Sequence, residues 1–235
     1  RVGVELHPLD QAELQRRDES ERLYAVNAAA AQYYHRILLH TSQGEGARRY
    51  LEGRGVTRKT MAAFQLGFAP DRWHDLETFL GKENHNTKDI LEAGLVVKSD
   101  KGNIYDRFRG RIIFPIRDVR GRVIGFGGRV LDDSQPKYLN TPTTPLFDKG
   151  SILYGIDLAN SSIRESGTAI IVEGYMDVIV PHQCGMTNLV ACMGTALTED
   201  QVNVLKRITK ELIFALDPDD AGMHAVEKGV DVARR

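Results

Sequence analysis

Cysteine is scarce in this sequence, and its few copies are not spaced to hold a structural metal. Only two occur in 235 residues, Cys184 and Cys192, and they do not form a CxxC pair. This spacing excludes a recognisable zinc site within the chain and argues against a disulfide framework. Both cysteines are expected to be small buried residues near strands. Their small number favours a reducing, cytoplasmic setting.

Long apolar runs are also missing. No stretch approaches the roughly 18 uncharged apolar residues that a membrane helix requires, so no membrane partner is expected. The opening RVGVELHPLD has no basic start followed by an apolar run, which excludes a secretory signal. Because the first residue is not Met, the chain is expected to be a piece excised from a longer protein.

A strong excess of charge is absent from the whole chain but not from its parts. The formal net charge is −1. Residues 101–150 carry ten Lys or Arg against five Asp or Glu, whereas residues 173–235 carry six against ten. A basic block beside an acidic block suits an enzyme that holds polyphosphate with one surface and metal ions with another. Composition alone leaves a charge-mixed, solvated surface as the alternative.

The first 150 residues predict a mixed subdomain that begins with helices and continues with antiparallel strands. The run 19–39 is rich in Ala and lacks Gly and Pro, which predicts a long helix. Shorter helices are expected near 46–51, 58–64, 75–80 and 88–92. From residue 95, β-branched runs at 95–97, 111–116 and 122–130 predict strands, with a DVRG turn between the last two. The arginines of that turn, Arg117, Arg120 and Arg122, are expected to form a solvated face.

Residues 151–235 predict a parallel sheet. Apolar strands at 169–172, 188–191 and 211–216 alternate with helices at 155–165, 175–183, 198–206 and 220–234. This alternation is typical of a parallel sheet with helices on both faces. The predicted fold class is therefore α/β, with an α+β subdomain over 1–150 followed by a Rossmann-like parallel sheet over 151–235.

Carboxylates directly follow two of the three predicted strands. The strand AIIV leads into Glu173, and the strand LIFAL leads into the segment DPDD, which contains Asp217 and Asp219. In an open parallel sheet, ligands bind at the carboxyl ends of the strands. Oxygen ligands without His or Cys favour Mg²⁺ or Mn²⁺, and a DxD pair suits the two-metal arrangement of phosphoryl transfer. The alternative is that Asp219 or Asp220 only caps the following helix.

At these residues the sequence resembles a known module. VEGYMD followed by DPDDAG is similar to the Toprim fold shared by primases, topoisomerases and some nucleases, over about residues 167–235. FRGRIIFPIRDVRGRVIGFGGRVL, PKYLNTPTTPLFDKG and LYG resemble the basic half of the bacterial DnaG-type primase polymerase domain, and GEGARRYLEGRGV and FQLGFAP extend the match to nearly the whole chain. The resemblance implies a DNA primase catalytic core, a nucleotidyltransferase that makes short RNA primers on single-stranded DNA with Mg²⁺ or Mn²⁺.

The same resemblance implies roles for individual residues. Glu173 would be an acid/base or metal-organising group, Asp177 would lie beside the metal site, and Asp217 and Asp219 would bind metal. The residues implied to face nucleotide or template are Arg107, Arg109, Arg129, Lys137, Tyr138, Asn140 and Lys149.

The resemblance also implies partners that lie outside this sequence. Members of the family normally begin with a zinc-binding domain and end with a domain that docks on the replicative helicase, and a further Asp pair follows in a later Toprim strand. We therefore expect residues 1–235 alone to bind metal and nucleotide weakly and to synthesise little primer. The implied setting is the cytoplasmic replication fork, with single-stranded DNA and NTPs as partners.

Other functions remain open from the sequence. A topoisomerase would need a tyrosine nucleophile outside the Toprim module, and a recombination mediator would carry zinc-ligand cysteines, which are missing here. A Toprim nuclease shares VEG and DxD, whereas a phage primase–helicase would add a GxxxxGK[ST] phosphate loop, which does not occur. A catalytically silent replisome scaffold is the contrasting class, and it would show no Mn²⁺ binding dependent on Asp217 and Asp219.

Overall fold

A long helix, α1 (Gln11–His40), runs across the first half of the protein. The computed structural model describes residues 10–194, 196–218 and 220–234, without the side chains of residues 220 and 221. The helix begins eight residues earlier than predicted because Asp10 and Glu13 form a capping box, in which the Glu13 amide donates to the Asp10 carboxylate at 2.6 Å. Its first three turns are mostly exposed, and its buried face begins at Leu23.

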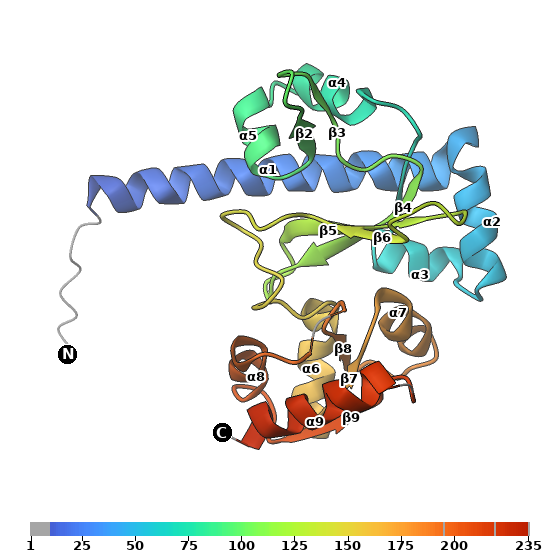
Figure 1. Cartoon of the computed structure of the whole chain (residues 1–235), viewed down its shortest axis with the longest axis vertical. Helices are drawn as coiled ribbons and strands as arrows, with labels where there is room; N and C mark the ends of the chain where they lie inside the picture. Colours follow the sequence, from blue (N-terminus) through green and yellow to red (C-terminus); the bar gives the residue numbers. More distant parts are fainter. Residues whose placement is uncertain (1–9, 195, 219, 235) are drawn as a thin grey trace.

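Figure 1 shows α1 between a four-stranded sheet and a small layer formed by α4, α5, β2 and β3. The sheet has the order β1-β4-β5-β6 and is antiparallel throughout, as predicted for its two long strands. Three short strands, β1, β3 and β6, were not predicted, since three residues carry little periodic signal. The remaining elements of this half are η1 (Ser42–Gly44), α2 (Glu45–Gly53), α3 (Arg58–Ala63), β1 (Gly67–Ala69), α4 (Asp75–Lys82), α5 (Thr87–Glu92), β2 (Val96–Lys98), β3 (Ile104–Asp106), β4 (Arg111–Arg117), β5 (Val123–Val130) and β6 (Tyr138–Asn140).

The arginines around the β4–β5 turn are not all solvated. Arg120 is exposed, as expected. Arg117 is largely buried, donates to Gln65 at 2.7 Å and lies 3.8 Å from the Asp157 carboxylate in the second half. The prediction of a solvated face is wrong for Arg117, because its anionic partner lies forty residues away and packs against β4 only in the folded protein.

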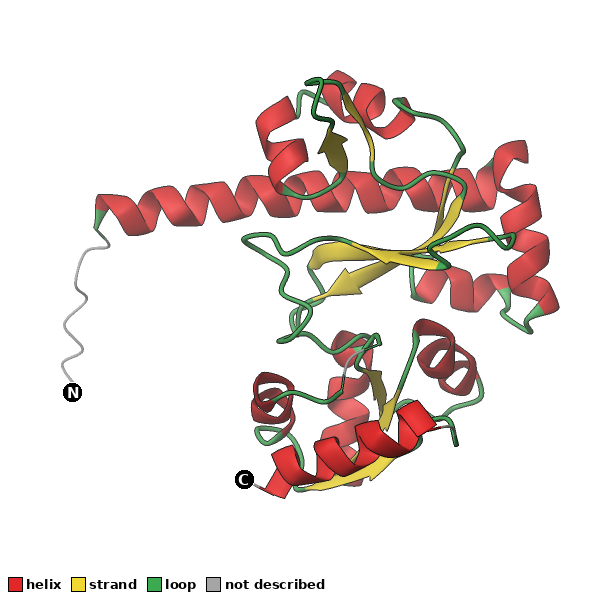
Figure 2. Ribbon diagram, viewed as in Figure 1, coloured by secondary structure: helices red, strands yellow, loops and turns green. Residues whose placement is uncertain are grey.

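The second half contains the predicted parallel sheet, in the order β8-β7-β9. Its strands are labelled in Figure 1, and Figure 2 shows them with helices around them. Thr198 caps its helix α8, as the sequence indicated. Cover on both faces was also predicted, and this is wrong at β9, where Ile213 is 46% exposed. The elements are α6 (Ile156–Ser166), β7 (Thr168–Val172), α7 (Tyr175–Gln183), β8 (Leu189–Ala191), α8 (Glu199–Leu205), β9 (Glu211–Phe214) and α9 (Asp220–Arg234).

Helix α7 joins the two halves at both of its ends. At its C-terminal end, the Gln183 side chain accepts from the Thr57 amide at 2.8 Å and from the Thr60 hydroxyl at 2.6 Å, and it donates to the Gly55 carbonyl at 2.9 Å. At its N-terminal end, Tyr175 packs into the core of the antiparallel sheet. One hydrophobic cluster therefore contains residues of both halves. The domain boundary at residues 150/151 stays a prediction.

Two smaller expectations have mixed outcomes. Cys192 is buried beside β8, as predicted, whereas Cys184 is exposed at the end of α7, so the prediction is wrong for that residue. Across the described ranges, every helix is too short or too polar to cross a membrane.

Candidate functional site

The carboxyl ends of β7 and β9 lie side by side and bring two acidic segments together. These strands pair in parallel, from Thr168 opposite Glu211 to Ile171 opposite Phe214. Beyond the paired residues, the Glu173 carboxylate accepts a hydrogen bond from the Asp217 backbone amide at 2.9 Å. Forty-four residues apart in sequence, the two segments are thus joined directly at the rim of the sheet. Glu173 is half-buried and Asp217 is exposed, so both carboxylates are accessible from solvent.

Asp177 lies next to this pair, on the first turn of α7. Its carboxylate accepts from the Gly174 amide at 2.9 Å, which makes it a cap for the helix. Its pKa is raised, first by partial burial and then by the negative charge of Asp217, against the lowering effect of the Gly174 hydrogen bond. The Asp177 carboxylate is therefore close enough to Asp217 for the two negative charges to repel each other.

These carboxylates fit a divalent cation by their chemistry. All the donors are oxygens, which suits hard ions such as Mg²⁺ or Mn²⁺, and a cation would relieve the repulsion between Asp177 and Asp217. Asp219, also predicted to bind metal, lies outside the described residues. Within the described part of the chain, no group of three or more His, Cys, Asp or Glu side chains is already arranged to hold an ion.

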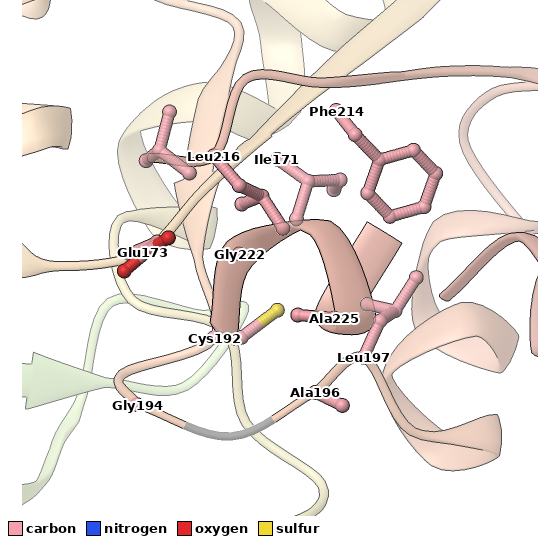
Figure 3. Close-up of a pocket in the computed structure, with 11 residues that line it drawn as sticks. Ile171, Glu173, Cys192, Gly194, Ala196, Leu197, Phe214, Leu216, Gly222 and Ala225 are labelled. Atoms are coloured by element: carbon pink, nitrogen blue, oxygen red, sulfur yellow. The ribbon is translucent and has the colours of Figure 1, made fainter. Parts of the chain in front are cut away.

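A pocket of about 230 Å³ opens beside Glu173. Figure 3 shows the Glu173 carboxylate at one edge of it, with the apolar side chains of Ile171, Leu216 and Phe214 and the start of α9 around the rest. Gly222 on α9 approaches closely, because a Cβ there would lie 3.3 Å from Glu173 Oε1 and 2.0 Å from the Asp217 carbonyl oxygen. The acidic rim is therefore packed too tightly for a side chain at position 222.

On the basic side, Arg107 and Asn140 form one unit. The Arg107 guanidinium donates to the Asn140 carbonyl through Nε at 3.2 Å and Nη2 at 3.1 Å. Burial lowers the pKa of Arg107, since a guanidinium loses hydration there. The Asn140 side chain accepts from the Tyr175 hydroxyl at 2.7 Å, and Tyr175 belongs to the helix that carries Asp177. The structure thus links a basic residue to the acidic rim through two side chains.

Arg129 and Tyr138 face each other across the β5–β6 pair. They are Cα partners in the register, and the Arg129 guanidinium lies 5.8 Å from the Tyr138 ring centroid and 4.6 Å from that of Tyr50. Tyr138 is 44% exposed, so part of its ring is accessible to a ligand. Lys137, which precedes β6, is exposed as well.

Arg109 lies in a different aromatic environment. Its guanidinium is 4.1 Å from the Trp73 ring centroid and 5.2 Å from that of Tyr105, and it donates to the Asp106 carbonyl. Trp73 is 57% exposed, and its ring meets Tyr105 edge-on at 5.2 Å. An exposed aromatic with an arginine stacked on it is a surface on which an unpaired base can stack.

Comparison with known proteins decides the family. A family model described as "DNA primase catalytic core, N-terminal domain" matches residues 33–160, and a "Toprim domain" model matches residues 167–234. The chain belongs to the DNA primase catalytic core family. It is 46% identical to a DNA primase of Clostridium acetobutylicum over 218 residues, covering 93% of this chain and 36% of that protein. It is 48% identical to a DNA primase of Deinococcus radiodurans over 214 residues, covering 90% of this chain and 37% of that protein.

Solved structures agree with this assignment. A DnaG primase catalytic domain bound to single-stranded DNA superposes with a TM-score of 0.85 at 40% identity, covering 92% of this chain and 68% of that one. A DNA primase domain from Pseudomonas aeruginosa superposes with a TM-score of 0.84 at 46% identity, covering 89% of this chain and 66% of that one. The predicted α/β fold class is confirmed. The chain spans about a third of the length of the curated primases it matches.

Within this primase core, Lys149 lies on the Toprim side. Helix α8 holds its loop, because Gln201 donates to the Ile152 carbonyl at 2.8 Å and Thr198 donates to the Gly150 carbonyl. A Cβ at Gly194, which follows β8, would lie 3.9 Å from Lys149 Nζ. Gly194 and Glu173 line the same pocket, so this ammonium group is the predicted basic residue associated with the acidic side.

Sequence reasoning missed Trp73 and Tyr175. Trp73 is the only tryptophan of the chain and lies in the polar segment PDRWHD, a setting that favours an exposed aromatic side chain over a buried one. Tyr175 lies inside the VEGYMD motif, in which the acidic residues carry the metal-binding signal and no pattern marks the tyrosine. The roles of the predicted site residues remain predictions.

Proposed function

We propose that this primase core synthesises short RNA primers on single-stranded DNA by metal-assisted nucleotidyl transfer. The observation that carries the proposal is the Glu173–Asp217 contact of 2.9 Å, which joins the two acidic segments at one rim. Helix α7 then connects this rim to the basic sheet through Tyr175 and Asn140. Acidic and basic surfaces belong on opposite sides of one nucleotide in such a reaction.

The residues of the rim would hold the divalent ions. Glu173, Asp177, Asp217 and Asp219 are the proposed ligands. Bound Mg²⁺ or Mn²⁺ supplies charge neutralisation at the phosphates and a lower pKa for the attacking hydroxyl. The 3′ hydroxyl of a primer, or of a first NTP at initiation, would attack the α-phosphate of the incoming NTP. A phosphodiester bond forms as the bond between the α- and β-phosphates breaks, and pyrophosphate leaves.

The basic residues would bind and orient the nucleotide and template. Arg107, Lys137 and Lys149 offer charge-assisted hydrogen bonds to phosphate oxygens. Tyr138, with Arg129 against one side of its ring, would stack on a base, and the Trp73–Arg109 surface would hold a template base. Positioning two reactants in this way supplies much of the rate enhancement of a reaction between bound substrates.

The similarity to a primase solved with single-stranded DNA supports the template partner. A replicative helicase and a zinc-binding domain are proposed partners through segments that the curated relatives have beyond the matched region. The proposed place of action is the cytoplasmic replication fork. A silent scaffold is disfavoured, because it would have no need for two carboxylates, those of Asp177 and Asp217, that repel each other at one rim.

Primer synthesis is the direct test. A protein extended to the length of the relatives should make RNA from NTPs and Mn²⁺ or Mg²⁺ only when single-stranded DNA is present. Residues 1–235 alone should make little, because the later acidic pair implied by the resemblance lies beyond them. Template-independent product, or none from the extended protein, would contradict the proposed function.

Replacing Trp73 with alanine should weaken binding of an oligothymidine strand by about tenfold, since one stacked base contributes roughly 1–3 kcal/mol. The salt dependence should not change, because no phosphate contact is removed. Lys137→Ala should instead lower the salt slope by about one unit. As Trp73 is the only tryptophan, quenching of its fluorescence by DNA reports on this surface alone.

Leu14→Ala is the matched control, because Leu14 is an exposed apolar residue, at 45%, on the projecting part of α1. Its DNA affinity should equal that of the wild type. Unchanged affinity in Trp73→Ala, together with unquenched wild-type fluorescence, would remove the Trp73 surface from the proposal.

A further inference from the structure

Tyr175 is a buried polar side chain next to the proposed nucleotide site. It is 4% exposed, its ring stacks on Phe114 at 4.6 Å with an interplanar angle of 6°, and it meets Tyr154 edge-on at 4.8 Å. Gly127 of β5 leaves room for its hydroxyl, because a Cβ there would lie 2.2 Å from the Tyr175 oxygen. The phenol is therefore held in one position by packing on several sides.

The hydroxyl has a single hydrogen-bond partner among the residues that the structure describes. It donates to Asn140 Oδ1 at 2.7 Å. Burial raises the pKa of Tyr175 well beyond its ordinary value, and the nearby Tyr138 adds to the effect, so the proton stays on the oxygen. A buried O–H group needs an acceptor, and the amide oxygen of Asn140 supplies it.

This bond fixes both ends of the Asn140 carboxamide. The group is planar, so an amide whose oxygen points at Tyr175 must direct its NH₂ group elsewhere. Asn140 is half-buried, and its NH₂ has no hydrogen-bond partner within the described ranges. The Asn140 carbonyl is meanwhile occupied by Arg107. The groups around Asn140 that can still bind a ligand are therefore N–H donors: the NH₂ of its own amide and the remaining N–H groups of the Arg107 guanidinium.

We propose that Tyr175 is a positioning residue, whose hydroxyl orients the Asn140 amide so that its NH₂ group donates to an acceptor oxygen of the bound nucleotide. The inference rests on the proposed function, because it assigns a task within the same site. Without the hydroxyl, the amide is free to rotate and can present its oxygen, which repels phosphate and carbonyl oxygens. The position of Tyr175 on α7 also means that the helix carrying Asp177 sets the orientation of a group on the basic sheet.

The test is a double-mutant cycle on ATP affinity, measured by calorimetry with MnCl₂ on the protein extended to the length of its relatives, since residues 1–235 alone are expected to bind nucleotide weakly. Tyr175→Phe keeps the stacked ring and removes only the hydroxyl, and it should raise the Kd for ATP about tenfold. Asn140→Ala should raise it by roughly 30-fold. In the Asn140→Ala background, Tyr175→Phe should have no further effect beyond about twofold, because the group that it orients is gone.

A second substitution at position 140 tests the donor role. Asn140→Asp keeps an oxygen that can accept from Tyr175 but replaces the NH₂ group with a carboxylate oxygen. It should weaken ATP binding at least as much as Asn140→Ala, since an acceptor then faces an acceptor. Wild-type affinity in Asn140→Asp would overturn the proposal.

Tyr154→Phe is a matched control in the same aromatic cluster. The Tyr154 hydroxyl is buried and has no hydrogen-bond partner in the described structure, so its removal should change the Kd for ATP by less than about twofold. Thermal melting of every variant separates loss of folding from loss of orientation. If Tyr175 had a purely structural role, Tyr175→Phe would lower the melting temperature, and its effect on the Kd for ATP would not depend on whether Asn140 is present.

The outcomes separate this inference from the proposed function. Suppose that the extended wild-type protein binds ATP. If Tyr175→Phe then leaves the Kd for ATP unchanged, or raises it equally with Asn140 and with Ala at position 140, the role of Tyr175 is overturned and the proposed function is not. An extended wild-type protein that binds no ATP with Mn²⁺ contradicts the nucleotide site itself, and the inference with it.

Discussion

Replacing Asp217 and Asp219 together with asparagine should abolish primer synthesis by the extended protein while single-stranded DNA binding survives. The expected loss is at least about 10³-fold, because removing ion ligands forfeits several kcal/mol of transition-state stabilisation. Asparagine is nearly the same size, and the bond to Glu173 comes from the backbone amide of residue 217, so it is retained. The two substitutions therefore remove the negative charges of residues 217 and 219 and leave the contact between residue 217 and Glu173 in place.

The matched measurement is Mn²⁺ binding by calorimetry, which should fall in the same variant. DNA affinity should remain within about twofold of the wild type, since the proposed DNA contacts lie on the basic side. Loss of both synthesis and DNA binding would indicate misfolding. Full synthesis with both substitutions would show that the rim is not the catalytic centre and would remove the main support for the proposed function.

The acidic rim was predictable because it depends on two local signals. A buried strand of known direction fixes where its carboxyl end lies, and an acidic residue directly after it must lie at that end. Glu173 satisfies both conditions, whereas Asp217 follows the half-exposed strand β9 three positions after Phe214. Their approach follows from the parallel pairing of β7 and β9. The capping role of Asp177 was not predicted, although an acidic residue on the first turn of a helix commonly binds the amide before it.

The connection between the two halves was not predictable in the same way. Arg117 looked like a turn residue because its partner Asp157 is on a helix forty residues later. The Tyr175–Asn140 bond joins a helix to a three-residue strand that has too little periodicity to be recognised. Such contacts depend on how helices and strands pack against one another after they have formed, and the residue pattern within one segment does not carry that information.

Gly222→Ala should lower primer synthesis by about 10²-fold although it adds only one methyl group. The added Cβ would lie 2.0 Å from the Asp217 carbonyl oxygen and 3.3 Å from Glu173 Oε1, so the start of α9 or the Asp217 turn must move. A displacement of about 1 Å in groups that position a reaction is enough for a loss of this size. The Mn²⁺ affinity should fall as well, since the displaced groups include the proposed ligands.

Gly46→Ala provides the comparison for this substitution. Gly46 is an exposed residue of α2, and a Cβ there would meet nothing within 4 Å. Alanine should stabilise that helix by roughly 0.5–1 kcal/mol and leave synthesis unchanged. If Gly222→Ala also retained wild-type synthesis and Mn²⁺ affinity, the close packing of α9 against Glu173 and Asp217 would have no part in the activity. A loss confined to Gly222→Ala would instead show that the reaction depends on how closely α9 holds the two acidic segments together.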